Sequence, residues 1–197
     1  MKNRSTSVSN QWLEHMMLAE DGFSDREGIV VRPATGTHAV DYLCQSVGKS
    51  DSYVLAYLIN AFKAFGYTPR NLDAFPYDWR LPPSKLEERD SAFTQMQAKI
   101  ELMVKLNGGA RVLLLGHSMG NKFIHYFLFW AEKNLSRAWI DAHVRCFVAV
   151  GAPWIGAAKS LRALLTGDAM GLDLFLNYED ALAVSRNFGG CLRIFAA

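Results

Sequence analysis

The sequence of 197 residues lacks several features that would mark particular classes of protein. Its formal net charge is only +2 and its lysines and arginines are scattered, so the charge pattern does not indicate a nucleic-acid partner. It has only three cysteines, Cys44, Cys146 and Cys191, without the spacing of metal ligands. We therefore expect free thiols, no disulfide framework, and no metal site or cofactor. Cys146 lies in an apolar run and is predicted to be buried.

Long hydrophobic runs are also missing. Residues 1–10 are polar and rich in serine, unlike the apolar core of a signal peptide. The longest weakly polar stretch, residues 146–158, is interrupted by Gly151, Pro153 and Gly156. It is shorter than the roughly 20 apolar residues that span a bilayer. We therefore predict no signal peptide and no transmembrane segment in this chain.

What is present suits a globular domain. Half of the residues are hydrophobic and 20% are charged, which provides enough apolar material for a core. The length is that of one domain, and no repeat or flexible linker divides the chain. Residues 1–197 are therefore expected to form a single domain.

Periodic apolar residues predict helices along the chain. The expected helices cover residues 11–18, 53–65, 84–107 and 119–133. Residues 50–52 are candidate N-caps for the second helix, and Gly66 is placed to end it. Ser84 and Glu87 fit a capping box at the start of the third. The last helix is apolar almost all round and is expected in the interior.

Short apolar runs predict strands between these helices. The expected strands cover residues 28–32, 72–75, 111–115 and 144–150. The last two are almost wholly apolar, as expected of parallel strands that are covered on both faces. The alternation of helices and strands predicts an α/β fold, with a mostly parallel sheet and helices on both of its faces.

One motif carries chemistry: Gly116-His117-Ser118-Met119-Gly120, which matches the pattern G-x-S-x-G. The pattern alone is common, but here a buried strand enters it and a buried helix leaves it, as in the nucleophile elbow of α/β-hydrolases. An elbow lifts the serine hydroxyl above the sheet, and small residues at 116 and 120 let strand and helix approach closely. The alternative is that Ser118 is only a turn residue.

The elbow also predicts an oxyanion donor. The corner lies at a helix N-terminus, whose unpaired N–H groups favour negative charge. The backbone N–H of Met119 would then bind the oxyanion that forms when Ser118 attacks an acyl carbonyl. Loss of one such donor lowers the rate by roughly 100- to 1,000-fold. Ser118 and Met119 are therefore the predicted catalytic residues.

A serine nucleophile needs a base, normally a histidine oriented by a carboxylate, and in this fold both follow the serine. Asp141 and His143 follow Ser118, but they precede the strand 144–150 and so lie at its opposite end. At ~3.3 Å per residue, that strand places them roughly 20 Å away, whereas a general base must lie within about 3 Å. His125 is expected to be a packed or surface histidine. The base is therefore predicted to lie outside this chain.

The other end of the chain is predicted to lack the second oxyanion donor. That donor normally comes from a loop after an earlier strand. Residues 1–28 contain a polar tail, a helix and a turn, but no such strand and loop. The chain is therefore expected to be an incomplete α/β-hydrolase domain that carries the nucleophile.

Further motifs are spread along nearly the whole chain. They are residues 26–32, 65–67, 76–83, 86–90, 116–120, 126–128, 151–156 and 166–171. The most specific are Tyr77-Asp78-Trp79-Arg80 and Gly151-Ala152-Pro153-Trp154. In their order and approximate spacing, these segments resemble the family of lecithin:cholesterol acyltransferase and phospholipid:diacylglycerol (or phospholipid:sterol) acyltransferase.

The resemblance implies a serine enzyme that moves an acyl group from a phospholipid to a sterol or diacylglycerol. Ser118 matches the family's nucleophile, and Met119 matches the residue that provides one oxyanion N–H. The family's catalytic Asp and His and its lid lie downstream of the matched region, so a partial gene product or an altered end is expected. The resemblance also implies peripheral membrane contact or a location at the endoplasmic reticulum.

Several alternatives stay open at this point. With water as the acceptor the protein would be a phospholipase, and without a base the chain could be a catalytically inactive lipid-binding or regulatory module. Asp78, Trp79 and Arg80 could contact substrate, or they could anchor a turn through a buried ion pair. Trp154 could line an acyl pocket or pack in the core.

Overall fold

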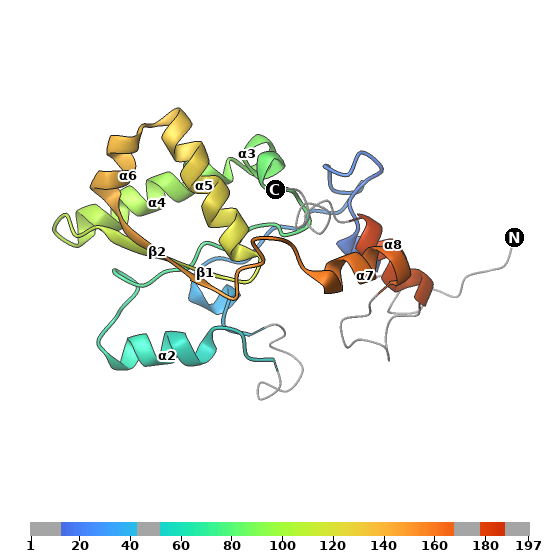
Figure 1. Cartoon of the computed structure of the whole chain (residues 1–197), viewed down its shortest axis with the longest axis horizontal. Coiled ribbons are helices and arrows are strands. Elements are labelled where there is room, and N and C mark those ends of the chain that lie inside the picture. Colours follow the sequence, from blue (N-terminus) through green and yellow to red (C-terminus); the bar gives the residue numbers. More distant parts are fainter. Residues whose placement is uncertain (1–12, 43–51, 168–177, 188–197) are drawn as a thin grey trace, which may run out of the picture.

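The computed structural model describes residues 13–42, 52–167 and 178–187 (Figure 1). In chain order its elements are η1 (Thr37–Ala39), α2 (Ala56–Ala64), α3 (Pro83–Asp90), α4 (Ala92–Leu106), β1 (Val112–His117), α5 (Gly120–Asn134), α6 (Arg137–His143), β2 (Val144–Val150), α7 (Ala158–Thr166) and α8 (Tyr178–Asn187). Residues 13–16 are also helical, within the predicted helix 11–18. In the parts of the chain that the structure describes, every helix is too short or too polar to serve as a membrane span.

The two strands β1 and β2 pair in parallel and form a small sheet. Val112 pairs with Val144 and His117 pairs with Val150, with a bulge directly after Val112. Parallel strands require a crossover connection, which α5 and α6 provide. The predicted parallel pairing of these two strands is therefore confirmed, and both strands end at the same edge of the sheet.

Only one face of this sheet is well covered by described residues. Helices α4, α5 and α6 gather on that side of the sheet (Figure 1). On the other face, Leu113 is 52% exposed and Val150 is 44% exposed. Cys146 is exposed as well and forms no disulfide. The predictions of strands covered on both faces and of a buried Cys146 are therefore wrong, because successive side chains alternate between faces and no described element shields the second face.

The hydrophobic core lies where α4 and α5 pack together against the covered face of the sheet. Phe93 and Met96 of α4, and Phe123 and Phe127 of α5, are buried at helical spacings of three or four residues. The ring centroid of Phe93 lies 5.3 Å from that of Phe123 and 6.2 Å from that of Phe127. On the opposite side of α5, Phe129 is 53% exposed. The helix that was expected to be interior all round is therefore buried on one side only.

Two predicted strands, residues 28–32 and 72–75, are not strands in the structure. A strand needs a hydrogen-bonded neighbour, and no described strand pairs with either segment. The carbonyl of Val31 instead accepts a hydrogen bond from the guanidinium of Arg80 (3.4 Å). The ring of Phe75 stacks on an aromatic ring of α5. Side-chain contacts, and not a strand ladder, hold these segments.

Helix α2 replaces the helix predicted over residues 53–65, with a later start. The residues before it form an isolated bridge with an earlier segment, which keeps them out of the helix. Its N-cap is Leu55, without a side-chain hydrogen bond, so the predicted N-cap at Ser52 is wrong. The other two candidates, residues 50 and 51, lie outside the described residues. Gly66 follows the helix with φ of 91°, as expected of a helix stop.

The capping box predicted at Ser84 and Glu87 is wrong. Helix α3 begins at Pro83, a residue that suits the first turn because it has no N–H to satisfy. The Glu87 carboxylate instead accepts hydrogen bonds from two backbone N–H groups at the start of α4 (2.7 and 3.2 Å). Between the two helices, Ser91 has a left-handed conformation with φ of 50°. The single helix predicted over residues 84–107 is therefore two helices.

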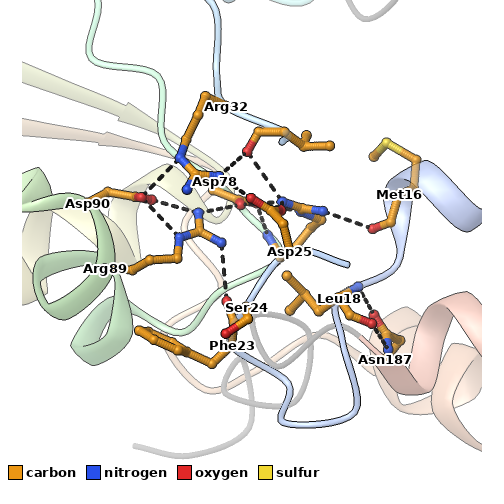
Figure 2. Close-up of polar contacts among 12 residues, drawn as sticks. Met16, Leu18, Phe23, Ser24, Asp25, Arg32, Asp78, Arg89, Asp90 and Asn187 are labelled. Carbon is orange, nitrogen blue, oxygen red and sulfur yellow. Dashed lines mark hydrogen bonds and ion pairs between the residues drawn. The ribbon is translucent and has the colours of Figure 1, made fainter. Parts of the chain in front are cut away.

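A cluster of buried charges joins segments that are far apart in the sequence (Figure 2). Arg80 is only 1% exposed and forms ion pairs with Asp78 (2.7 Å) and Asp25 (2.9 Å). Arg89 of α3 pairs with Asp78 and Asp90, both at 2.6 Å. We call these five residues the Arg80 cluster. It confirms that Asp78 and Arg80 anchor a turn through a buried ion pair.

The cluster keeps its buried acids ionised. Burial by itself would raise the pKa of Asp78, but hydrogen bonds from Arg80 and Arg89, together with the Arg80 charge, lower it below its ordinary value of 3.8. The pKa of Asp25 is lowered in the same way, against the effect of burial, by Arg32 and Arg80. Their stabilising contribution is therefore present above about pH 4, and it is lost as the pH falls through the lower folded-state values.

We expect Asp78→Asn to lower the free energy of unfolding at neutral pH by about 3 kcal/mol, because two buried arginines would lose a charged partner. Between about pH 5 and pH 3, the variant should lose less stability than the parent. Denaturant unfolding at each pH measures both effects. Glu88→Gln is the control, since it removes the exposed pair with Lys85 and should change stability by less than about 1 kcal/mol. Equal losses in the two variants would contradict the role of the cluster.

Candidate active site

Ser118 lies at the corner where β1 ends and α5 begins (Figure 1). Its φ of 50° is in the left-handed region, which residues other than glycine seldom adopt. Such a conformation costs of order 1–3 kcal/mol and persists only where the surroundings enforce it. Among the described non-glycine residues, only Ser91 shares a positive φ. The corner therefore has the strained strand-to-helix geometry that a nucleophile elbow requires.

Hydrogen bonds hold this corner against the end of β2. The backbone N–H of Ser118 donates to the carbonyl of Val150 (2.9 Å). The side-chain amide of Asn121 donates to the carbonyl oxygens of both Ser118 (2.8 Å) and Val150 (3.0 Å). The sequence reasoning missed Asn121. The available signal was a lone amide directly after the motif, at the start of a strongly apolar helix.

The two glycines of the motif have different surroundings. A Cβ atom at Gly116 would lie 2.6 Å from Oδ1 of Asn121, closer than real Cβ contacts, so this position requires glycine. A Cβ atom at Gly120 would meet nothing within 4 Å among the described residues. The expected close approach of strand and helix is therefore confirmed at Gly116 but is wrong at Gly120.

The predicted oxyanion donor precedes the first turn of α5. Met119 is the N-cap residue of this helix, and its carbonyl accepts hydrogen bonds from the next turn. Its own N–H has no acceptor in the described part of the chain. Ser118 is exposed to solvent. The structure thus places an exposed serine and an available N–H together at the positive end of a helix dipole.

The histidines that follow Ser118 are engaged elsewhere. His143 ends α6, where its Nδ1 lies 2.8 Å from a carbonyl oxygen of the same helix. It is at the opposite end of β2 from Ser118, because β1 and β2 run in parallel. Asp141 forms an exposed ion pair within α6 at 3.4 Å. His125 places its ring 5.8 Å from that of Trp154. The structure does not bring Asp141 and His143 to Ser118.

Trp154 lies close to the candidate nucleophile along the chain's path. It follows β2, and Lys122 from the first turn of α5 donates a hydrogen bond to its carbonyl (3.0 Å). Its ring contacts the ring of Phe147 edge-on at 6.2 Å and remains 44% exposed. Trp154 is therefore not a core residue. It is a half-exposed side chain at the edge of the sheet where Ser118 lies.

A cavity of about 410 Å³ lies beside the Arg80 cluster and not beside Ser118. Its lining includes Arg32, Tyr77, Asp78 and Lys99. Burial raises the pKa of Tyr77, so its hydroxyl stays protonated at neutral pH. Asp78 is already paired with two arginines. No group of three side chains that could hold a metal ion occurs among the residues described.

The fold and the corner define a protein of the α/β class with an exposed serine at a strand-to-helix turn. The family model described as lecithin:cholesterol acyltransferase matches residues 2–196. The chain belongs to the lecithin:cholesterol acyltransferase family. The resemblance inferred from the motifs is therefore confirmed.

Individual relatives have different printed activities. The chain is 31% identical to phospholipid:diacylglycerol acyltransferase of Schizosaccharomyces pombe, over 91% of this chain and 30% of that protein. It is 33% identical to phospholipid–sterol O-acyltransferase of Arabidopsis thaliana, over 84% of this chain and 27% of the relative. It is 35% identical to lysosomal phospholipase A and acyltransferase of Homo sapiens, over 80% of this chain and 38% of the relative. The chain thus spans about a third of the length of these relatives.

We expect Ser118→Gly to raise the free energy of unfolding by about 1 kcal/mol, because glycine adopts positive φ without strain. Ser160→Gly is the matched control, since Ser160 lies inside α7, where glycine should destabilise by about 1 kcal/mol. Denaturant unfolding of the two variants and the parent gives both values. A loss of stability in Ser118→Gly would show that position 118 is not strained.

Proposed function

We propose that this chain carries the nucleophile part of a lipid acyltransferase, in an incomplete α/β-hydrolase domain formed by residues 1–197. Ser118 attacks the ester carbonyl of a phospholipid, which forms an acyl-serine and releases a lysophospholipid. The acyl group then passes to the hydroxyl of a sterol or diacylglycerol, and Ser118 is regenerated. The left-handed corner at Ser118, in a chain of this family, is the observation that supports the proposal most strongly.

In this proposal the Met119 N–H stabilises the oxyanion of each tetrahedral intermediate. Two features support that role: Met119 directly follows the candidate nucleophile, and it caps a 15-residue helix. A donor that is already oriented needs no reorganisation when charge develops, so it contributes roughly 100- to 1,000-fold in rate. No proton moves to or from this group, and its contribution should therefore not depend on pH.

The base is proposed to come from the part of the relatives' length that this chain does not span. Among the described residues that follow Ser118, His125 and His143 are engaged in other contacts. Without a histidine at the serine hydroxyl, the acyl-transfer step would be slow, since serine is a weak nucleophile when protonated. The same placement favours a second candidate for the chain by itself, a non-catalytic lipid-binding or regulatory module.

The acceptor is the least determined part of the proposal. One relative is named as a diacylglycerol acyltransferase, another as a sterol acyltransferase, and a third as a phospholipase A and acyltransferase. Water and an alcohol react with an acyl-serine by the same chemistry, so the choice depends on how the site excludes water. The third name therefore supports phospholipase activity as an alternative outcome at the same serine.

A fluorophosphonate probe tests the nucleophile. The 197-residue chain should react at least about 1,000-fold more slowly than a longer version that includes the region carrying the base, because an activated serine depends on its histidine. Labelling in the longer version should map to Ser118 and disappear in Ser118→Ala, as intact-protein and peptide mass spectrometry will show. Rapid labelling of the short chain at Ser118 would mean that its own residues supply a base. Labelling that survives Ser118→Ala would overturn the assignment.

Phospholipid must reach Ser118 from a lipid surface, and the residues after β2 offer a contact for one. We call Trp154, Ile155, Leu161 and Leu165 the α7 surface. These side chains are 44%, 101%, 48% and 63% exposed, respectively. Arg162 is also exposed on α7, and residues 142–167 contain no Asp or Glu. An exposed apolar strip with a tryptophan and flanking cations suits an interface with anionic lipid.

We expect Ile155→Glu and Leu161→Glu each to weaken binding of the chain to phosphatidylcholine–phosphatidylserine vesicles by about tenfold, since each removes one inserting apolar side chain and adds a negative charge. Leu102→Glu is the matched control because Leu102 of α4 is similarly exposed, at 54%, outside the α7 surface. Vesicle sedimentation at several lipid concentrations measures the affinity. Equal weakening by all three substitutions would contradict a membrane contact at α7.

A further inference from the structure

We propose that Asn121 is a positioning residue for Ser118, and that Gly116 is glycine in order to admit the Asn121 side chain. The inference rests on the proposed function only in treating Ser118 as the nucleophile. In this pair, Asn121 holds the left-handed corner in place, and Gly116 provides the space that Asn121 occupies.

The contacts of Asn121 connect both sides of the corner. Its amide nitrogen bonds the carbonyl of Ser118 within the corner and the carbonyl of Val150 at the end of β2. The Val150 carbonyl also accepts the N–H of Ser118. One donor therefore links the strained residue, the helix that follows it and the neighbouring strand. A displacement of the corner would have to break hydrogen bonds on both sides.

The burial of Asn121 argues against a merely space-filling role. The side chain has 0% exposure, and its Oδ1 atom is buried without a hydrogen-bond partner among the described residues. A buried acceptor without a partner costs of order 1–3 kcal/mol. An apolar residue would avoid that cost at this place in the core. The gain that offsets it is therefore sought at the two carbonyls which the amide group holds.

Gly116 shows the same requirement from the side of the strand. Its φ is not positive, so its backbone conformation is one that any residue can adopt. The obstacle to a side chain there is Asn121, whose Oδ1, Cγ and Cα atoms would lie 2.6, 3.1 and 3.1 Å from a Cβ. Gly120 has no such neighbour among the described residues. Glycine at 116 is thus explained by Asn121 and not by strand geometry.

Fixing Ser118 matters for acyl transfer because both reacting groups depend on this corner. The orientation of the Ser118 hydroxyl and of the Met119 N–H changes with the backbone angles at residue 118. A misplacement of about 1 Å can lower a rate by roughly 100-fold. Asn121 does not touch the substrate in this proposal. It acts by restricting the backbone that carries the groups which do.

The test reads the backbone of the 197-residue chain directly, by amide hydrogen exchange and ¹³C chemical shifts in NMR spectra. In Asn121→Ala, the Ser118 amide should exchange at least about tenfold faster, because its local opening becomes easier. Its Cα and Cβ shifts should move away from left-handed values. The Leu114 and Leu115 amides in the middle of β1 serve as internal controls and should keep their protection. If Asn121→Ala does not fold, Asn121→Ser, which is too short to reach both carbonyls, replaces it.

A double-mutant cycle tests the partnership with Gly116. Gly116→Ala should shift the unfolding equilibrium toward the unfolded state by at least about tenfold more in the parent than in Asn121→Ala, because the clash is absent from the second background. Gly120→Ala is the matched control and should be tolerated equally in both backgrounds. Unfolding in denaturant gives the four equilibrium constants of the cycle and the control values.

Three results would overturn the proposal. One is unchanged exchange and chemical shifts of Ser118 in Asn121→Ala. Another is an equal rise in exchange at Ser118, Leu114 and Leu115, which would indicate general loss of stability. The third is an additive cycle between Gly116→Ala and Asn121→Ala. None of these readouts uses catalysis, so they are independent of fluorophosphonate labelling, whose failure would instead reject Ser118 as the nucleophile.

Discussion

The structure depends on one constraint, the left-handed turn by which β1 passes into α5 at Ser118. This turn sets the direction in which α5 leaves the sheet, and α5 supplies half of the hydrophobic core through Phe123 and Phe127. Strain at residue 118 is tolerated because Val150 and Asn121 hold the corner through several hydrogen bonds. Parallel pairing makes this possible, since it brings the end of β2 to the edge where β1 ends. The candidate nucleophile is therefore located by the same contacts that join the two strands.

The Arg80 cluster organises the part of the chain that precedes the core helices. It connects Asp25, the turn at Asp78 and the end of α3 by charge-assisted hydrogen bonds, in a region with little regular secondary structure. Buried ion pairs of this kind contribute less net stability than their short distances suggest, because desolvation opposes them. What they provide here is specificity, since each carboxylate has one arrangement that satisfies it. The cluster and the aromatic core are therefore complementary, the first polar and the second apolar.

Membership of the family limits the chemistry more than it limits the substrate. The relatives' names share phospholipid and acyl transfer, but they differ in the acceptor. The corner at Ser118 is consistent with this variety, because formation of an acyl-serine precedes the choice of acceptor. The exposed sheet face and the α7 surface, by contrast, are apolar areas around the candidate site. They can influence access of lipid and water without altering the serine itself.

The sequence by itself determined the family, the parallel pair of strands, the core-facing stripes of α4 and α5, and the serine corner. These features depend on local patterns: apolar runs, helical spacing and a glycine–serine motif that suits one turn. Tertiary structure decided the rest. Whether residues 28–32 became a strand depended on a neighbouring strand, and a guanidinium from Arg80 took that place. Whether Cys146 was buried depended on what covers the second face of the sheet. The importance of Asn121 appeared only when Gly116, Ser118 and Val150 were brought together, since no spacing rule connects an amide in a helix to a carbonyl at the end of a strand 29 residues later.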